Sequence, residues 1–425
     1  MALTRIKMGL SIFVATIGMA APTAFAQAAT DADVVAAKEA AQRGDWKTLD
    51  TLRQRLAGHP LEAYAAYWAI TGALDRVPEA DVQAFLARYP DSPLAESLRR
   101  EWLKVLGAAG NWTLFRAEHP KLINDDAEVT CYDLQERLAR DDADAPAEAR
   151  ALFLMGNESP PACDTLFASL VVGGRVSAED TWIRLRKLLA ANLVRDAKRT
   201  SGFLNARETI PEKSLDRAAA DPAGYLAKDR SSLAQRAQRE IALFALERLA
   251  RSKPDEAAER LERIATKLGA DDARYAWGRI AYQAALNHDP HALAWYAQAG
   301  DLLTDTQVAW KARAAMRAGE WKTVLAAIQA LPPEQQRDPT WRYWRSRALR
   351  QLGEAAAADG LLKSLARETN FYGLLAAEDL GTIAPPDWKG WRPEAADLDR
   401  VRALPGIQRA LLLYRIGLDN EGVRE

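Results

Sequence analysis

Alanine far outnumbers the residues that favour strands, and this imbalance constrains the fold class more than any other feature of the sequence. The 425 residues include 84 alanines, against 29 valines and isoleucines together. Alanine is the best helix former, whereas β-branched residues favour strands. The sequence therefore predicts an all-α protein and argues against an all-β fold or a parallel-sheet α/β enzyme.

A helix end marked by glycine, followed by a polar residue and a tryptophan, occurs three times. The copies are Gly44-Asp45-Trp46, Gly110-Asn111-Trp112 and Gly319-Glu320-Trp321. Glycine suits the left-handed residue after a helix, and Asp or Asn can cap the next helix. The copies lie 66 and 209 residues apart, near multiples of the about 34 residues of a tetratricopeptide repeat. Helical hairpins of this kind bury their apolar faces by stacking, so we predict an irregular helical-hairpin superhelix, a U-shaped α-solenoid with tetratricopeptide-like stacking.

The C-terminal third shows the clearest helix boundaries. Asp338-Pro339 predicts a helix start, with an N-cap and a proline at the first helical position, and Gly353 ends that helix. Further helices are predicted over 354–367 and 370–380. The proline-rich segment 382–393 is the best candidate for a domain boundary, because proline and glycine interrupt regular structure there.

The N-terminus has the pattern of a secretory signal peptide. Arg5 and Lys7 precede an apolar run over 8–21, and Ala24-Phe25-Ala26 fits a signal-peptidase site. The apolar run is shorter than the ~20 residues of a membrane-spanning helix, and no second run follows it. We therefore expect residues 1–26 to be removed, the mature chain to be periplasmic, and no stable membrane span to remain.

The sequence contains two cysteines, Cys131 and Cys163. An even pair in an exported chain predicts a disulfide, which would close a loop of about 33 residues and contribute roughly 3.7 kcal/mol in the chain-entropy model. Metal binding is the alternative interpretation. The four histidines, at positions 59, 119, 288 and 291, show no ligand spacing relative to the cysteines or to one another, so no metal site is predicted.

Few residues suggest catalysis. The sequence lacks the signatures G-x-S-x-G, Walker A, H-E-x-x-H and G-x-G-x-x-G, and its net charge of −1 gives no basic excess for nucleic acid. Arginines and lysines instead recur along two predicted helices, as Arg184, Arg186 and Lys187 and then as Arg342, Arg345, Arg347 and Arg350. We interpret them as the solvated side of amphipathic helices, with binding of an anionic polymer as the alternative. Tryptophans at helical spacing are core residues more often than sugar platforms.

Several segments resemble the N-terminal half of the soluble lytic murein transglycosylases. They are spread over residues 35–425 in the order of that family: Cys131-Tyr132, 162–167 (ACDTLF), 182–187 (WIRLRK), 341–344 (WRYW), 371–381 (FYGLLAAEDLG) and 400–404 (RVRAL). The resemblance implies a superhelical domain over 27–385 and part of a helical linker domain over 386–425. In that family a lysozyme-like catalytic domain follows.

The resemblance also implies a chemistry. One glutamate of the catalytic domain cleaves the β-1,4 bond between N-acetylmuramic acid and N-acetylglucosamine, first as acid and then as base on the 6-hydroxyl of the same sugar, which gives 1,6-anhydro products. This reaction needs one carboxyl with a raised pKa and no cofactor. The G-L-M-Q and A-Y-N-A-G segments of that domain do not occur in this sequence. Its two Glu-Ser pairs, Glu96-Ser97 and Glu158-Ser159, lie far upstream of the expected place and are interpreted as coincidence.

We therefore expect this chain to lack the catalytic domain and to be inactive alone, as the scaffold part of a transglycosylase that acts in peptidoglycan turnover. Its expected partners are glycan strands, the missing catalytic domain and other cell-wall enzymes, with no nucleic acid. The candidate contacts to glycan or to the catalytic domain are Trp341, Arg342, Trp344, Arg345 and Tyr372. The alternative is an exported, non-enzymatic helical-repeat module that binds another protein.

Overall fold

The computed structural model describes residues 29–90, 92–228, 233–382 and 392–425. Every regular element in these ranges is a helix, which confirms the all-α prediction. The predicted signal peptide (1–26) and the predicted domain boundary at residues 385–386 lie outside the described residues. None of the helices in the described ranges is long and apolar enough to cross a membrane.

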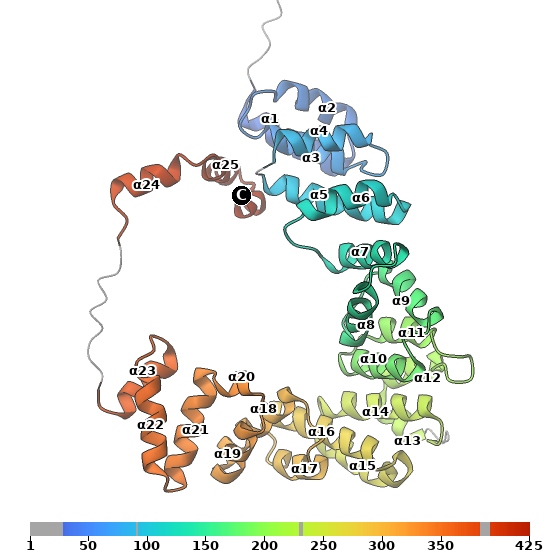
Figure 1. Ribbon diagram of the computed structural model, residues 1–425, viewed down its shortest axis with the longest axis vertical. Helices are drawn as coiled ribbons and strands as arrows, with labels where there is room; N and C mark the ends of the chain where they lie inside the picture. Colours follow the sequence, from blue (N-terminus) through green and yellow to red (C-terminus); the bar gives the residue numbers. More distant parts are fainter. Residues whose placement is uncertain (1–28, 91, 229–232, 383–391) are drawn as a thin grey trace, which may run out of the picture. The chain divides into compact units, whose positions relative to one another are not determined.

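The chain divides into two compact units, and the first combines residues from both ends of the sequence. Unit 1 contains the described parts of 1–109, 113–123 and 392–425. Its elements are α1 (Asp31–Arg43), α2 (Trp46–Arg55), α3 (Glu62–Thr71), α4 (Glu79–Arg88), α5 (Pro93–Ala109), most of α6 (Trp112–Glu118), a short 3₁₀ turn (His119–Lys121), α24 (Ala395–Arg402), α25 (Pro405–Arg415) and α26 (Asp419–Arg424) (Figure 1).

Polar contacts join the two segments of unit 1. The hydroxyl of the buried Tyr64 on α3 donates to Glu425 Oε1 at 3.0 Å, and Arg409 on α25 holds the same carboxylate at 3.0 and 2.7 Å. Lys38 on α1 pairs with Glu421 on α26 at 2.7 Å. These contacts dock α25 and α26 against α1 and α3.

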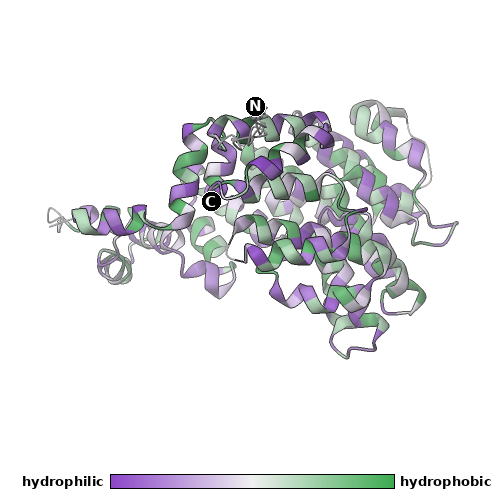
Figure 2. Cartoon of the chain, turned by 90° about the horizontal axis from the view of Figure 1, so that it is seen from above, coloured by the Kyte–Doolittle hydropathy of each residue, from purple (hydrophilic) through white to green (hydrophobic). Residues whose placement is uncertain are grey.

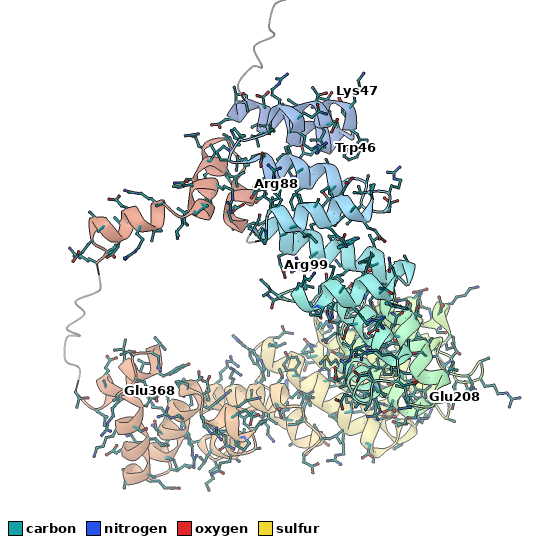
Figure 3. The ribbon with its side chains drawn as sticks, turned by 45° about the horizontal axis from the view of Figure 1, so that its top comes forward. Trp46, Lys47, Arg88, Arg99, Glu208 and Glu368 are labelled. Carbon is teal, nitrogen blue, oxygen red and sulfur yellow. A yellow bond between two sulfur atoms is a disulfide. The ribbon has the colours of Figure 1, made fainter. Side chains whose placement is uncertain are left out.

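Further ion pairs fasten neighbouring helices of the N-terminal segment of unit 1. Arg99 on α5 (Figure 3) donates to Glu118 at the end of α6, at 3.3 Å. Arg88 on α4, labelled in the same figure, pairs with Glu62 on α3, which also accepts a hydrogen bond from the Tyr89 hydroxyl at 2.9 Å. Each pair joins a helix to one that is close to it in sequence.

The three Gly-x-Trp segments end and begin helices as predicted. Gly44, Gly110 and Gly319 have φ angles of 69°, 68° and 70°, the left-handed conformation that favours glycine. The Asp45 side chain caps α2 by accepting from the Thr48 N–H at 3.1 Å. Trp46 is 45% exposed, yet its ring covers Gly72, where a Cβ would lie 2.2 Å from the ring. Gly72 therefore lets the end of α3 approach Trp46.

Unit 2 contains residues 110–112 and the described parts of 124–391. Its helices are α7 (Ala127–Ala139), α8 (Ala145–Met155), α9 (Ala162–Val172), α10 (Ala178–Ala190), α11 (Val194–Ser201), α12 (Glu212–Ala220), α13 (Pro222–Lys228), α14 (Arg236–Ala250), α15 (Pro254–Leu268), α16 (Ala270–Leu286), α17 (Ala292–Ala299), α18 (Asp305–Ala318), α19 (Trp321–Gln329), α20 (Pro333–Gln336), α21 (Pro339–Gln351), α22 (Ala355–Leu365) and α23 (Phe371–Asp379).

Successive helices of unit 2 pack as stacked hairpins. Helices α14, α16 and α18 lie side by side, and each also packs against the helix that follows it, α15, α17 or α19 (Figure 1). Hydrophilic and hydrophobic residues are interspersed along the helices (Figure 2), as expected for amphipathic elements. The helical-hairpin stacking predicted from the sequence is therefore confirmed.

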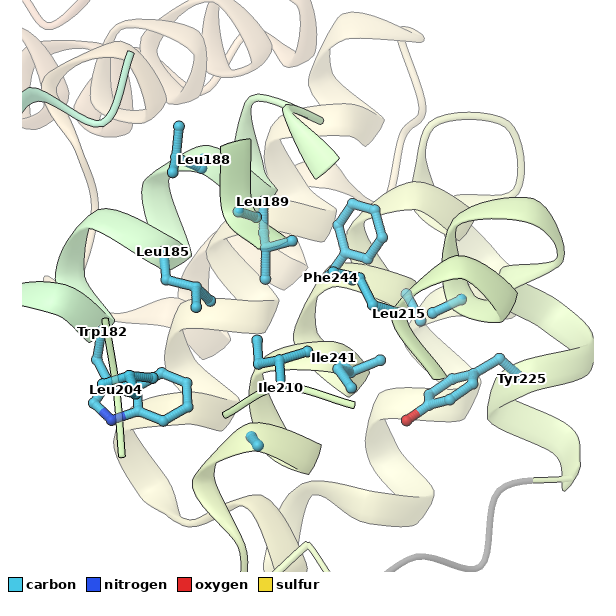
Figure 4. Packing of buried hydrophobic residues seen from close by; sticks show 14 residues of the cluster. Trp182, Leu185, Leu188, Leu189, Leu204, Ile210, Leu215, Tyr225, Ile241 and Phe244 are labelled. Atoms are coloured by element: carbon cyan, nitrogen blue, oxygen red, sulfur yellow. The ribbon is translucent and has the colours of Figure 1, made fainter. Parts of the chain in front are cut away.

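The interior of unit 2 consists of apolar clusters shared between consecutive helices. One cluster brings Trp182 and Leu185 of α10 together with Leu215 of α12, Tyr225 of α13 and Ile241 of α14 (Figure 4). No hairpin could bury these side chains by itself, so each depends on its neighbours.

Helix α21 has the boundaries that the sequence predicts. The Asp338 side chain accepts from the Thr340 N–H at 2.8 Å, and Pro339 occupies the first helical position. Gly353 follows the helix with a φ angle of 88°. The predicted helices 354–367 and 370–380 correspond to α22 and α23.

The predicted disulfide between Cys131 on α7 and Cys163 on α9 is confirmed. The two Cα atoms lie 5.1 Å apart, and both residues are buried in a cluster with Phe153 and Phe167. The bond therefore joins two helices that already pack against each other.

The interpretation of the α10 arginines as a solvated face is wrong for Arg184, which is 2% exposed. Its guanidinium donates to the Phe153 carbonyl at 2.7 Å and to the Ser159 hydroxyl at 2.9 Å, and it lies over the Phe167 ring at 4.7 Å. Burial lowers the pKa of Arg184 to about 10. Helical periodicity predicted a solvated side chain. It could not foresee that backbone carbonyls at the end of α8 accept hydrogen bonds from this cation inside the unit.

Arg186, two residues further along α10, is held by carboxylates instead. It donates to both oxygens of Glu240 at 2.9 and 2.8 Å and to Asp272 at 2.6 Å. Burial would lower the pKa of Arg186, but these two carboxylates raise it overall. The group thus links α10, α14 and α16 through charge as well as through apolar packing.

Candidate functional site

A polar groove of about 650 Å³ lies on helices α14, α16 and α18 of unit 2, next to the end of α10. Two of its lining residues, Ala190 and Leu286, are apolar. The others carry hydroxyl, amide or charged groups: Glu247, Arg251, Arg279, Tyr282, Gln283, Thr304, Thr306 and Gln307. We call this site the α16 groove. Its two arginines and one glutamate give the lining a formal charge of +1.

One buried carboxylate organises the cations of the α16 groove. The Glu247 side chain is 4% exposed and pairs with Arg279, and Arg251 lies 3.9 Å from it. Both guanidinium groups also reach the Ala190 carbonyl, at 3.4 and 3.5 Å. Burial would lower the pKa of Arg279, but the hydrogen bond and charge of Glu247 raise it overall. The groove therefore keeps both cations in fixed positions.

The polar side of the α16 groove is positioned by the start of α18. The Thr304 hydroxyl accepts from the Gln307 N–H at 3.3 Å, and the Gln307 side chain accepts from the Thr304 N–H at 2.8 Å, which forms a capping box. Gly278 on α16 allows the start of α18 to lie close to α16, because a Cβ at position 278 would lie 3.3 Å from Gln307 Nε2.

Arginine and aromatic side chains in contact with one another extend from the α16 groove across α16, α18 and α21. We call Arg279, Tyr282, Trp310, Arg313 and Trp341 the arginine–aromatic row. The Arg279 guanidinium lies 5.6 Å from the Tyr282 ring centre, and Tyr282 meets Trp310 edge to face at 6.4 Å. Arg313 then lies between Trp310 and Trp341, at 5.1 and 4.8 Å from their ring centres. Cation–π attraction and edge-to-face contacts hold the row together.

The five residues predicted to contact glycan or the catalytic domain lie in different environments. Trp341 is buried at 6% exposure and ends the arginine–aromatic row, whereas Trp344 is partly buried between two core clusters. Arg342 pairs with Glu368, which is labelled in Figure 3, and donates to the Ser364 hydroxyl at 2.9 Å.

The other two of these five residues are Tyr372, which is partly exposed, and Arg345, which has a guanidinium nitrogen without a hydrogen-bond partner among the described residues. Tyr372 packs against Tyr343 with ring centres 5.5 Å apart and is partly exposed. The Nε atom of Arg345 is buried and has no hydrogen-bond partner among the described residues. Contact of any of the five with glycan stays a prediction.

The two Glu-Ser pairs have structural partners. Glu96 on α5 pairs with Arg100 at 3.4 Å and accepts from the Ile123 N–H at 3.0 Å. Glu158 lies in the turn between α8 and α9 beside Arg195, at 3.3 Å. Both carboxylates are therefore engaged with cations.

The α16 groove combines cationic, hydroxyl and amide groups around one buried carboxylate. That carboxylate, Glu247, pairs with Arg279 and lies 3.9 Å from Arg251. Guanidinium, hydroxyl and amide groups beside an aromatic ring suit a polar, hydroxyl-rich ligand that carries negative charge.

The α16 groove and the first four residues of the arginine–aromatic row were not predicted from the sequence. A signal was present, because Arg279 and Tyr282 lie three residues apart, as do Trp310 and Arg313. That spacing places the two members of each pair on one helix face. The pairing of Glu247 with Arg279 had no comparable signal, since it joins helices 32 residues apart in sequence.

Comparison with known proteins identifies relatives of this chain, although no family model matches the sequence. It is 24% identical over 365 residues to the soluble lytic murein transglycosylase of Escherichia coli K12, covering 80% of this chain and 54% of the relative. It is 25% identical over 392 residues to the enzyme of the same name from Salmonella typhimurium, covering 85% and 58%. The chain thus spans little more than half the length of these relatives.

A solved structure supports the same relationship. An inactive mutant of the lytic transglycosylase Slt from Pseudomonas aeruginosa matches with a TM-score of 0.64 at 27% identity, over 92% of this chain and 64% of that one. The resemblance that the sequence suggested is therefore confirmed in both sequence and fold.

Proposed function

We propose that this chain, a relative of the soluble lytic murein transglycosylases, is a periplasmic scaffold that holds glycan strands for peptidoglycan turnover. The observation that carries the proposal is the α16 groove with its arginine–aromatic row. Aromatic rings can stack on pyranose rings, and fixed guanidinium groups can bind the carboxylates that murein carries. The sequence relatives, which are named as murein transglycosylases, support this choice of polymer.

The complete protein is proposed to cleave the bond between N-acetylmuramic acid and N-acetylglucosamine and to leave 1,6-anhydro ends. The chain of 425 residues is proposed to bind strands without cleaving them, because its α16 groove holds no carboxylate free of cations. Muropeptide analysis after incubation with purified sacculi should therefore show no anhydro products. Their appearance would contradict this part of the proposal.

Strand binding is tested by sedimentation with purified sacculi. The wild-type chain should pellet with sacculi above the level of an unrelated helical protein. Arg251→Glu reverses a 40% exposed charge of the α16 groove and should weaken binding about tenfold, the equivalent of about 1.4 kcal/mol. Arg263→Glu on α15 is the matched control, since Arg263 is exposed outside the groove and pairs with Glu259 on its own helix.

The two variants separate binding by the α16 groove from a general charge effect. Circular dichroism should show the same helix content for both. Failure of the wild-type chain to pellet would contradict strand binding. Equal loss with Arg263→Glu, or no loss with Arg251→Glu, would contradict the assignment to this groove.

A protein-binding module is the second candidate, and a separate observation favours it. Helices α24 and α25 of unit 1 and the link between them expose apolar side chains, each 43–57% exposed: Leu398, Val401, Leu404, Leu411 and Tyr414. We propose that these residues meet another protein, either a lysozyme-like catalytic domain or a further cell-wall enzyme. Replacement of Val401 and Leu411 by serine should leave sacculus binding intact. Loss of that binding would contradict the proposal that glycan strands and a partner protein bind to two separate surfaces.

A further inference from the structure

Two aspartates and a histidine from separate hairpins of unit 2 meet at one point. Asp255 is the second residue of α15, whereas Asp289 and His291 lie in the turn between α16 and α17. His288 shapes this turn by taking a φ angle of 61°. The sequence predicted no metal site because the histidines lack ligand spacing, but that argument could not include Asp255, which is 36 residues from His291.

The donor atoms of the three residues have the spacing of metal ligands. His291 Nδ1 lies 3.1 Å from Asp289 Oδ1 and 3.3 Å from Asp255 Oδ1. All three donor atoms lie within 4.8 Å of one another. In a tetrahedral zinc site with bonds of about 2.0–2.1 Å, neighbouring ligand atoms are about 3.3 Å apart. One cation can therefore contact all three atoms after small side-chain adjustments.

The charges of the three residues also favour a cation. Within the part of the chain that the structure describes, the ion pairs of Asp255 and Asp289 are with His291 alone. The two aspartates bring a formal charge of −2 to this point, and a divalent cation would neutralise both. Two carboxylates and one imidazole suit zinc or a similar first-row metal, because magnesium and calcium prefer oxygen ligands only.

Two local contacts hold the ligands in place. The His291 N–H donates to Asp289 Oδ1 at 2.8 Å, which fixes the turn, and the imidazole stacks on Trp295 with ring centres 5.5 Å apart. The side chains of Asp255 and His291 are 67% and 61% exposed, so water can complete the coordination. The three residues therefore form an exposed site between two hairpins and not a buried catalytic centre.

From this geometry we propose that Asp255, Asp289 and His291 bind a zinc-class divalent cation, which ties the start of α15 to the start of α17. The two hairpins α14–α15 and α16–α17 would then share a metal link in addition to their apolar contacts. The site does not depend on the proposed glycan function, since none of its residues lines the α16 groove.

Isothermal titration of the metal-free 425-residue chain with zinc chloride tests the proposal. We expect one site per chain with micromolar affinity and a rise in melting temperature when zinc is added. His291→Ala and Asp255→Asn should each weaken zinc binding about 10- to 100-fold. His288→Asn is the matched control, because His288 lies in the same turn outside the cluster and asparagine tolerates its left-handed backbone.

A second measurement guards against a variant that fails to fold. Cobalt bound by the wild-type chain should give the visible absorption of a low-symmetry site, and His291→Ala should abolish it while circular dichroism stays unchanged. The absence of zinc binding by the wild-type chain at 100-fold molar excess would overturn the proposal. Unchanged affinity in His291→Ala, or equal weakening in His288→Asn, would overturn it as well.

Discussion

Unit 1 and unit 2 use the same kind of helix, yet different contacts hold them together. In unit 2 the hydrogen bonds that tie hairpins together span at most tens of residues, such as the 86 between Arg186 and Asp272. In unit 1 the hydrogen bonds of Tyr64 with Glu425 and of Arg415 with Asp31 span 361 and 384 residues. Unit 2 can therefore form by adding one hairpin at a time, whereas unit 1 needs both ends of the chain.

Both units contain buried charges as well as exposed ones. The Glu240 side chain of unit 2 is 1% exposed beside Arg186, and the Glu425 side chain of unit 1 is fully buried beside Arg409, whereas Arg415 of unit 1 is 70% exposed beside Asp31. Exposed ion pairs contribute little, because water and salt screen them. Buried pairs matter more when one partner is removed, since the other charge is left without compensation.

The largest effect is expected when the buried ion pair of unit 2 is broken. Arg186→Met should lower the free energy of unfolding by about 3–4 kcal/mol, because the buried Glu240 loses two hydrogen bonds from Arg186 and keeps only Arg236, at 3.6 Å. Urea unfolding followed by circular dichroism measures this loss. Arg195→Met is the control: Arg195 is 79% exposed beside Glu158, so its removal should cost less than about 1 kcal/mol. Equal losses in the two variants would contradict the role of burial.

A slightly smaller effect is expected for the disulfide of unit 2. Cys131→Ala with Cys163→Ala should destabilise the unit by about 2–4 kcal/mol, because the unfolded chain regains the freedom of a closed loop. Calorimetry of the double variant and of the reduced wild-type chain should give the same lowered melting temperature. A melting temperature unaffected by reduction would show that apolar packing of α7 and α9 is sufficient.

Weakening the contacts that hold α25 and α26 in unit 1 should cost less stability than the two changes in unit 2, and its effect should be confined to these helices. Tyr64→Phe removes the hydroxyl that donates to Glu425 and should cost about 1.5 kcal/mol. Hydrogen exchange should become roughly tenfold faster over residues 405–424 and stay unchanged over 233–382. Tyr132→Phe on α7 is the control within unit 2. Faster exchange throughout both units would mean that they unfold together, which would contradict the comparison.

The smallest effect concerns a half-buried ion pair inside unit 2. Hydrogen bonds from Arg137 hold the pKa of Asp142 at about 2, below its ordinary value of 3.8. Because the pKa is lowered in the folded state, this contribution is present above pH 3.8 and is lost as the pH falls toward 2. Carbon-detected NMR should show the Asp142 midpoint near 2 in the wild type and nearer 3.8 in Arg137→Gln. An unchanged midpoint would exclude Arg137 as the cause.

Local patterns predicted the parts of this molecule that depend on neighbouring residues. The left-handed Gly44 and Gly319, the Asp338 cap and the disulfide all follow from residue types close together in sequence or from a count of cysteines. Burial of Arg184 could not be predicted, because helical periodicity assigns a cation to the solvated face and cannot foresee carbonyl acceptors from another hairpin. The α16 groove was missed for the same reason, since Glu247 and Arg279 meet only after stacking.

The pairing of Cys131 with Cys163 also affects how the protein can be oxidised. The 425 residues contain two cysteines, so within them one intramolecular connectivity is available. Oxidation of this chain by itself then requires an oxidant but no disulfide isomerase, and incorrect oxidation can join only separate chains. A non-reducing gel therefore distinguishes correctly oxidised monomers from covalent dimers, which makes the chain simple to monitor during production.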